Sequence, residues 1–352
     1  MKFNRKQLLE VIDIVKPAVA KREIVQQQTH LIFTGTNLCA TNGSIMISHP
    51  LPSEFVSSIK SDDLIKILQS SSSDEVEINL DKDKVRIVTP DTKAKLSVML
   101  DERDKVEELI KSLSDEMSDW KFLPEDFSDA LWLCAFSASK NQTDLVLTSV
   151  FVNGEDVSTT DKVRTSWYKM KEGVDKMLIS AVDALELSNL TVSEYCESDN
   201  WLHFKTENEA TFSCRKVMGD HLPLVSLFSL IDSGSTIFTL PSEFKTAIES
   251  TYVMLDNVKT DPTKTVSVLF KKGEIICKAE QERGSLEKII KTEYEGEEKE
   301  FHVNPYFLSQ VLEKSTDVSF HSMKRQDREF SVALFTSGNF KHMVQLPLLK
   351  GK

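Results

Sequence analysis

A helix-like segment occurs three times along this chain at nearly equal intervals. Residues 123–131 read Leu-Pro-Glu-Asp-Phe-Ser-Asp-Ala-Leu, and residues 240–248 read Leu-Pro-Ser-Glu-Phe-Lys-Thr-Ala-Ile. A more divergent copy opens the chain at residues 3–12. The intervals are about 115 to 120 residues, which is the size of an ordinary domain. The repeat therefore predicts three consecutive domains of one kind, an arrangement that favours an arc or ring over a single catalytic cleft.

The length and composition fit this division. A chain of 352 residues is too long for one compact core, and 40% hydrophobic with 28% charged residues is typical of a globular protein. The run Asp232-Ser233-Gly234-Ser235 has the composition of a linker, and a second joint is expected near Ser118. The predicted domains are 1–118, 119–235 and 236–352.

Each third is predicted to contain two helices, and each helix is followed by strands. Apolar residues at helical spacing and capping signals place the helices. The expected helices are 5–16, 61–68, 124–139, 180–185, 241–255 and 304–312. Alternating apolar runs separated by turn residues predict antiparallel hairpins, among them 75–80 with 84–88 and 330–335 with 342–346. The fold class is therefore α+β, with two helices packed on antiparallel sheets in every domain.

Two helix starts are specified by individual residues. Ser61 is expected to be the N-cap of its helix, because a serine hydroxyl can accept hydrogen bonds from the first free backbone N–H groups. Asn304 is expected to cap the last helix, since Pro305 follows it at the first helical position.

Several classes of protein are disfavoured by the composition and the motifs. A net charge of −12 argues against coating nucleic acid with the whole surface, but it allows a locally basic channel. The five cysteines and seven histidines have no metal-ligand spacing, and no phosphate-binding loop is present. The cysteines are expected to be buried, reduced thiols. We expect no catalytic residue, no metal and no cofactor, and neither a membrane span nor a secretory signal. A cytoplasmic protein is predicted.

Four local motifs occur in the order found in one known family. They are Thr-Asp-Lys-Val-Arg at 160–164, Arg-Lys-Val-Met-Gly-Asp at 215–220, Phe-His-Val-Asn-Pro-Tyr-Phe-Leu at 301–308 and Val-Gln-Leu-Pro-Leu at 344–348. Together with the three-fold repeat, they resemble the bacterial DNA polymerase III beta subunit, the DNA sliding clamp family. The resemblance covers the whole chain at low identity.

The chain also departs from the family pattern. Lys162 and Val163 stand where the family has Gly and His, and Leu349-Lys350-Gly351-Lys352 make a longer, more basic end. These differences indicate a divergent clamp, encoded by a bacterium or by a phage that replicates in bacterial cytoplasm.

The resemblance implies a closed homodimeric ring that surrounds duplex DNA without reading its sequence. It also implies a replicative DNA polymerase and a clamp-loader ATPase as partners, and no enzymatic activity. Basic and polar side chains on or beside the helices are expected to line the DNA channel: Arg5, Lys6, Lys21, Arg22, Lys66, Lys140, Asn141, Lys245 and Lys314.

The same resemblance implies an apolar groove between the middle and last domains for a short peptide from these partners. The residues expected to form it are Leu147, Thr160, Lys162, Val163, Arg164, Leu227, Phe228, Val344, Leu346, Pro347 and Leu348. Arg164 is expected at the edge of this groove.

Two alternative functions remain open from the sequence. Asp232-Ser233-Gly234 resembles the catalytic loop of an aspartic protease, although that chemistry needs two carboxylates and the chain has no second such motif. The other alternative is an interaction protein with the clamp fold that does not encircle DNA.

Overall fold

The computed structural model describes residues 1–22, 28–98, 108, 111, 116–220, 222–231, 235–325 and 328–346. The chain forms two compact units, and each is made from two separate stretches of sequence. One unit comprises 1–128 and 182–216, and the other comprises 129–181 and 217–352. The fold is of the α+β class, with antiparallel pairing of all assigned strands in the described part of the chain.

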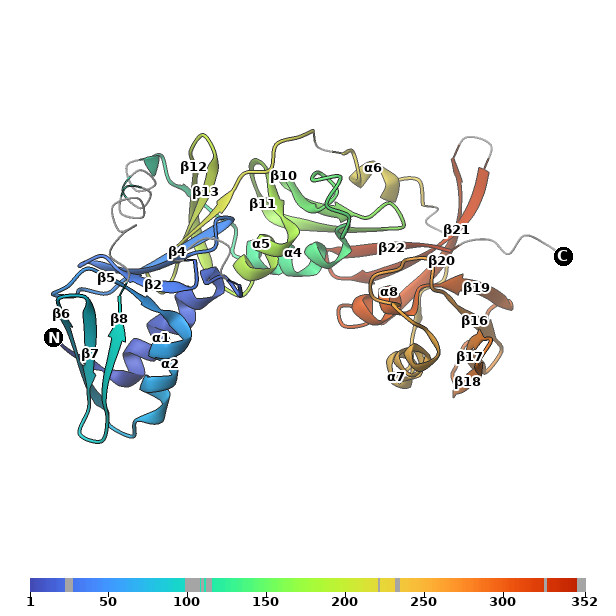
Figure 1. The fold of residues 1–352 in the computed structure, drawn as a ribbon. Helices are drawn as coiled ribbons and strands as arrows, with labels where there is room; N and C mark the ends of the chain where they lie inside the picture. Colours follow the sequence, from blue (N-terminus) through green and yellow to red (C-terminus); the bar gives the residue numbers. More distant parts are fainter. Residues whose placement is uncertain are drawn as a thin grey trace. The chain divides into compact units, whose positions relative to one another are not determined.

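The first unit contains two helices at its N-terminal end and two sheets. Figure 1 shows α1 and α2 lying side by side. The sheets have the orders β1-β6-β7-β8 and β5-β2-β3-β4-β14-β13-β12-β9. The bounds of the elements are β1 Lys2–Asn4, α1 Arg5–Val15, η1 Lys16–Ala18, β2 His30–Phe33, β3 Asn37–Thr41, β4 Ile45–Pro50, β5 Ser57–Lys60, α2 Ser61–Ser70, β6 Glu75–Asp81, β7 Lys84–Val88, β8 Lys93–Ser97, β9 Lys121–Phe122, α5 Ala181–Leu187, β12 Val192–Glu197, β13 Trp201–Thr206 and β14 Thr211–Arg215.

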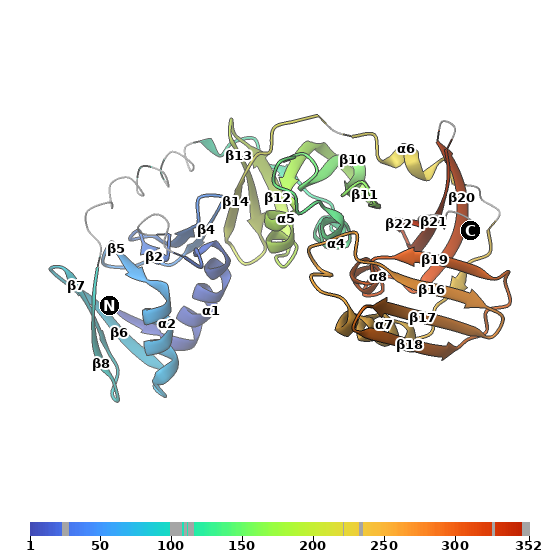
Figure 2. The same cartoon turned by 45° about the vertical axis from the view of Figure 1, so that its right-hand side comes forward.

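The second unit also contains two sheets, and the larger of them has fewer strands than the larger sheet of the first unit. Its sheets have the orders β10-β11-β22-β21-β20-β15 and β18-β17-β16-β19, and the four strands of the latter lie side by side in Figure 2. The bounds are α4 Phe127–Cys134, η2 Ala135–Ser137, β10 Ser149–Thr160, β11 Arg164–Ser180, α6 Val225–Phe228, β15 Phe238–Thr239, α7 Glu243–Ser250, η3 Thr251–Met254, β16 Val266–Lys271, β17 Glu274–Gln281, β18 Gly284–Lys291, β19 Lys299–Val303, α8 Pro305–Val311, β20 Asp317–Arg325, β21 Arg328–Ser337 and β22 Phe340–Leu346.

The three-fold sequence repeat reappears as a repeated sheet topology. In each third, a short strand before the first helix pairs with the strand that follows the second helix, and two further antiparallel strands complete the set. The three sets are β1-β6-β7-β8, β9-β12-β13-β14 and β15-β20-β21-β22. The predicted hairpins 75–80 with 84–88 and 330–335 with 342–346 are confirmed by the pairing of β6 with β7 and of β21 with β22.

The helices bury one face each, as their apolar spacing predicts. In α1 the buried residues are Leu8, Ile12 and Val15, which recur at intervals of three or four and so lie on one side. In the second unit Phe270 is the centre of an aromatic cluster that includes Phe244 and Phe301. These clusters attach the helices to the sheets and so fix the backbone from which the functional side chains project.

One of the two predicted caps is confirmed and the other is wrong. The Asn304 side chain accepts hydrogen bonds from the backbone N–H of Tyr306 at 2.9 Å and of Phe307 at 3.4 Å, directly before Pro305. Ser61 is the first residue of α2 and is buried, and Lys60 occupies the cap position without a side-chain hydrogen bond. The strand β5 runs directly into α2, so no turn is left in which Ser61 could act as a cap.

Candidate functional site

The second unit contains an apolar groove of about 380 Å³. Its walls come from the turn between β10 and β11, from the segment at 222–230, and from the last three strands. The lining residues are Leu147, Thr160, Lys162, Val163, Thr165, Leu222, Pro223, Leu224, Ser226, Leu227, Leu230, Met323, Phe330, Met343 and Gln345. Leu222 and Leu230 remain substantially exposed at its rim, so the groove offers apolar surface to a partner.

The turn from Thr160 to Arg164 is held rigidly by its own polar groups. The Thr160 hydroxyl donates to the Arg164 carbonyl at 2.7 Å, and the backbone N–H of Lys162 donates to the Thr160 hydroxyl at 3.0 Å. The Asp161 carboxylate accepts from the backbone N–H groups of Val163 and Arg164, both at 2.9 Å. Lys162 takes a φ of 78°, a left-handed conformation in which glycine is the common residue.

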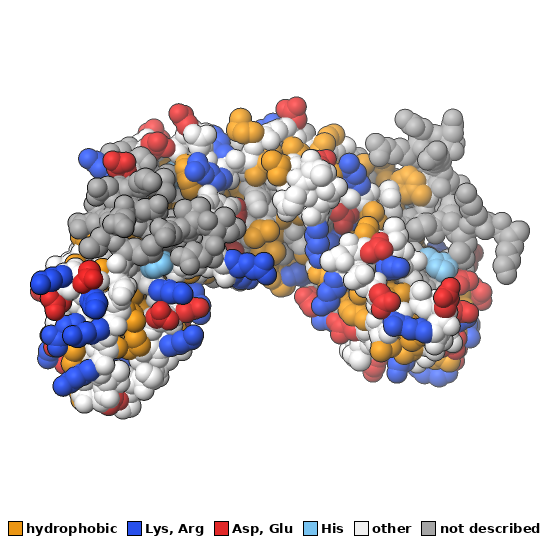
Figure 3. All heavy atoms as spheres, in the orientation of Figure 1, with side chains coloured by type: hydrophobic (Ala, Val, Ile, Leu, Met, Phe, Trp, Pro, Cys, Tyr) orange, Lys and Arg blue, Asp and Glu red, His pale blue; other side chains and the backbone are white. Residues whose placement is uncertain are grey.

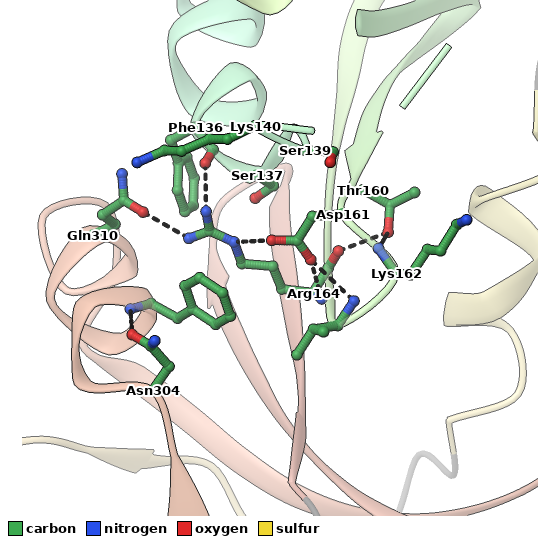
Figure 4. Close-up of polar contacts among 12 residues, drawn as sticks. Phe136, Ser137, Ser139, Lys140, Thr160, Asp161, Lys162, Arg164, Asn304 and Gln310 are labelled. Atoms are coloured by element: carbon green, nitrogen blue, oxygen red, sulfur yellow. Dashed lines mark hydrogen bonds and ion pairs between the residues drawn. The ribbon is translucent and has the colours of Figure 1, made fainter. Parts of the chain in front are cut away.

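The Arg164 side chain connects this turn to η2 and α8. Its Nε donates to Asp161 at 2.9 Å, its Nη1 to the Gln310 side chain at 2.7 Å and its Nη2 to the Phe136 carbonyl at 2.8 Å (Figure 4). The guanidinium also lies 4.1 Å from the centre of the Phe307 ring. Arg164 is 2% exposed, and burial lowers its pKa while the Asp161 carboxylate acts to raise it. A side chain so enclosed positions the turn and does not itself line the groove.

The last strand contributes to the groove through alternate residues. Met343 and Gln345 line it, whereas Val344 and Leu346 are buried on the opposite face of β22. The pairing of Arg164 with Val344 and of Thr165 with Met343 sets this register. The expectation that Val344 and Leu346 line the groove is therefore corrected, because successive strand residues point to opposite faces.

The other predicted groove residues divide into three sets. Those that line the groove are Leu147, Thr160, Lys162, Val163 and Leu227. Phe228 is buried beneath it, in a cluster with Met323 and Met343. Pro347 and Leu348 lie outside the described residues.

The sequence analysis missed most of one wall of the groove and named only Leu227 among the lining residues of that wall. This wall is the run Leu222-Pro223-Leu224, with Ser226 and Leu230 after it. Its signal was present, because a proline between leucines cannot continue a sheet and keeps apolar side chains outside it, and this run begins three residues after Gly219.

Of the basic residues predicted for a DNA channel, those in the first unit have different environments. Arg5 donates to the backbone carbonyls of Ser73 at 2.6 Å and of Leu68 at 3.1 Å, and so satisfies the end of α2. Lys6 forms a 3.3 Å ion pair with Asp74, between side chains that are both exposed.

Lys21, Arg22 and Lys66 are exposed at the surface. Lys21 lines a cleft of about 730 Å³ together with Lys16 and Lys60, and the carboxylates of Asp13, Asp62 and Glu186 share its walls.

The predicted channel residues of the second unit are engaged with their neighbours. Lys140 donates to the Lys259 carbonyl at 3.0 Å, and Asn141 accepts from Thr143. Lys245 lies 3.1 Å from Glu313. Lys314 lies over the ring of Trp132, and burial lowers the pKa of Lys314 to about 8.

A histidine and two serines, residue types that hydrolases use, come together in the second unit. His342 contacts the hydroxyls of Ser166 at 2.8 Å and Ser137 at 3.3 Å, but all three side chains are fully buried. Burial, and next the charge of Arg164, hold the pKa of His342 well below its usual range. The protease candidate Asp232 lies outside the described residues.

In the described part of the chain, no group of three or more His, Cys, Asp and Glu side chains is arranged to hold a metal ion. All five cysteines are free and buried, as expected, and burial raises the pKa of Cys39 to about 11. Within the same residues no helix is long and apolar enough to cross a membrane.

In two sheets, a strand of one repeat pairs with a strand of another repeat, and the two pairings have the same register. In the first unit β14 pairs with β4, with Thr211 opposite Ser48. In the second unit β22 pairs with β11, with Lys341 opposite Trp167. Thr211 and Lys341 each come directly after the residue that closes their hairpin, Ala210 and Phe340. Ser48 and Trp167 each lie two residues after the first paired residue of their strand, Met46 and Thr165.

The corresponding strands β8 and β18 are sheet edges in the described structure. Figure 3 shows Lys and Arg side chains gathered over the region of β6, β7 and β8. Arg86 and Lys95 face each other across the β7–β8 pair, and Lys84 and Lys93 lie beside them. Like charges directly opposite each other repel in a cross-strand pair, and an acidic surface placed against β8 would relieve this repulsion.

Comparison with known proteins identifies the fold. No family model matches the chain, and no curated protein matches it. Solved structures match along 99% of both chains. They include a putative DNA polymerase III beta subunit from Eubacterium rectale at 16% identity and a TM-score of 0.74, and the beta chain of DNA polymerase III from Streptococcus pneumoniae at 16% and 0.77. A DNA polymerase sliding clamp from Pseudomonas aeruginosa matches at 14% and 0.72. The chain therefore has the DNA sliding clamp fold.

Proposed function

We propose that this protein is a DNA sliding clamp, a non-enzymatic processivity factor that encircles duplex DNA and tethers a replicative polymerase. The observation that carries the proposal is a pairing of strands between repeats that occurs twice within the chain and has two corresponding strands at sheet edges. Two junctions between repeats are formed within the chain, and the corresponding edges β8 and β18 are left for another copy. Two head-to-tail contacts between two copies use all four edges and close a ring.

The internal junctions supply the register of the proposed contact. Applied to β8 and β18, it puts Lys93 opposite Glu287 and Lys95 opposite Ser285 of the second copy. On the inner face it puts Ala94 opposite Leu286 and Leu96 opposite Gly284. Apolar or small residues then meet on the face toward the core, and on the outer face Lys93 meets the opposite charge of Glu287. This complementarity supports the homodimer.

The three domains 1–118, 119–235 and 236–352 belong to the same proposal. Each large sheet is then a joint between neighbouring domains, and the closed ring contains six domains. The predicted channel residues, in particular the exposed Lys21, Arg22 and Lys66, contact phosphates without reading bases. The remaining members of the proposed set also contact neighbouring groups of this chain; they are Arg5, Lys6, Lys140, Asn141, Lys245 and Lys314.

The groove in the second unit is the proposed docking site for a peptide segment of the polymerase and of the clamp-loader ATPase. Its leucines and methionines supply the apolar pockets that aliphatic and aromatic anchors need. The setting is the bacterial cytoplasm, including that of a phage-infected cell.

A threading experiment tests encirclement without requiring the loader. Linear duplex DNA with biotin at both ends is mixed with the protein, the ends are then blocked with streptavidin, and the complex is washed in 0.5 M salt. A ring remains on the DNA after the wash and is released when a restriction enzyme cuts the DNA. Retention that does not depend on blocked ends, or loss in every case, contradicts encirclement and favours the interaction-protein alternative.

A further inference from the structure

The groove has a marked asymmetry of charge. Among the described residues that line it, Lys162 alone carries a charge, and the others are apolar or neutral polar. The protein as a whole carries a net charge of −12, so the groove, whose described lining residues include one lysine and no carboxylate, differs in charge from the rest of the protein. A partner segment that enters the groove meets this ammonium group at its rim.

The backbone holds Lys162 in this position at a cost. Its φ of 78° is unfavourable for a side chain with a Cβ, and the surrounding hydrogen bonds of Thr160 and Asp161 maintain it. Figure 4 shows the Lys162 side chain directed away from the Arg164 network. The turn therefore presents the ammonium group outward from a rigid base.

The existing contact of Lys162 leaves its charge available. The ammonium lies 3.9 Å from Asp144, and the two side chains are 73% and 43% exposed. Exposed pairs at this separation contribute little and are screened by salt. The Asp144 carboxylate also accepts a 3.3 Å hydrogen bond from the backbone N–H of Leu147, and it is not among the groove-lining residues.

From these observations we infer that the groove selects linear peptides in which an Asp or Glu side chain lies beside the apolar anchors and contacts Lys162. This inference rests on the proposed peptide-binding function of the groove and specifies the chemistry of its partner. The apolar anchors supply most of the affinity, and the carboxylate supplies discrimination. Lys162 is thus a specificity-determining residue of this chain.

Calorimetry with two synthetic peptides tests the inference. Both are acetylated and amidated nonapeptides with Leu, Leu and Phe anchors, and they differ only in one Asp or Asn beside the anchors. At 50 mM salt the Asp peptide is expected to bind about two- to five-fold more tightly than the Asn peptide, and the ratio is expected to approach one at 0.5 M salt.

Variants assign this ratio to Lys162. In Lys162→Gln both peptides are expected to bind equally, while Lys162→Arg retains the preference. Lys162→Asn is a second neutral variant that tolerates the positive φ. Lys169→Gln is the matched control, because Lys169 of β11 forms an exposed 3.2 Å ion pair with Glu155 of β10, outside the groove. It is expected to keep the wild-type ratio.

Each outcome separates the inference from the function on which it rests. Equal binding of both peptides to the wild-type protein, or a preference that persists in Lys162→Gln and Lys162→Asn, overturns the role of Lys162 while the groove remains a peptide site. Binding of neither peptide overturns both claims. Ring closure and threading on DNA are measured independently of the groove.

Discussion

Reversing one charge at the proposed ring contact should open the ring. In the register inferred from the internal junctions, Lys93 of β8 faces Glu287 of the second copy. An opposite-charge cross-strand pair contributes about 0.2–1 kcal/mol, and Lys93→Glu converts this gain into a repulsion of similar size. The loss is then about 0.5–2 kcal/mol per contact, and a closed dimer contains two contacts. The dimer is expected to weaken by about 1–4 kcal/mol, a roughly five-fold to several-hundred-fold increase in Kd.

Sedimentation equilibrium at several protein concentrations and at 50 mM salt measures this change. The charge swap Lys93→Glu with Glu287→Lys is expected to restore dimerisation. Lys84→Glu is the control, because Lys84 lies on the same sheet face but on β7, which is paired on both sides. If Lys93→Glu dimerises like the wild-type protein, or if the swap fails to restore the dimer, the register and the edge-to-edge contact are wrong.

Three further predictions concern the stability of the site and its unit. Arg164→Met leaves buried acceptors without their donors and should lower the free energy of unfolding by about 3–5 kcal/mol, measured by urea denaturation; an unchanged midpoint would show that the buried network is dispensable. Gly219→Ala should cost about 1–3 kcal/mol and weaken peptide binding, because a Cβ at Gly219 would lie 2.4 Å from Val146, which packs behind the groove wall. Burial holds the pKa of His203 at about 4 and that of His342 well below 6.5, so both stay neutral in the folded protein when the unfolded chain takes up protons. Their contribution to the free energy of unfolding should therefore be fully present above pH 6.5 and should fall on acidification from 6.5 towards 4, by up to about 1.4 kcal/mol per pH unit for each histidine. Urea midpoints at pH 7 and pH 5 that coincide would contradict this.

The residues that define local structure were readable from the sequence. Asn304 followed by Pro305 marks the start of α8 because a cap needs only the next few backbone N–H groups. The hairpins β6–β7 and β21–β22 follow from alternation between turn residues. The three-fold repeat, which first suggested the fold, is likewise a property of the sequence alone, and the whole-chain likeness to sliding clamps is consistent with it.

Elsewhere local signals were insufficient. Asn153-Gly154 looks like a turn between two strands, yet β10 continues through it with shifts of register where it pairs with β11. Gly154 takes a φ of 61° there, which fits a bulge as well as a turn. The neighbouring strand decided between the two, because its hydrogen bonds hold both halves of β10 in one ladder.

The groove shows most clearly what only the tertiary structure decided. One face of the last strand carries Phe340, Val344 and Leu346 and the other carries Lys341, Met343 and Gln345, so alternation in the sequence marks the first face as the core but does not indicate whether the second meets solvent or the groove. The pairing with β11, a strand far away in sequence, fixed that choice. Arg164 was readable as part of a conspicuous turn, but its burial depends on Phe136 and Gln310 arriving from α4–η2 and α8. Short-range hydrogen bonds and side-chain periodicity specify elements; the side of an element that is buried depends on packing partners whose positions no local stretch of sequence contains.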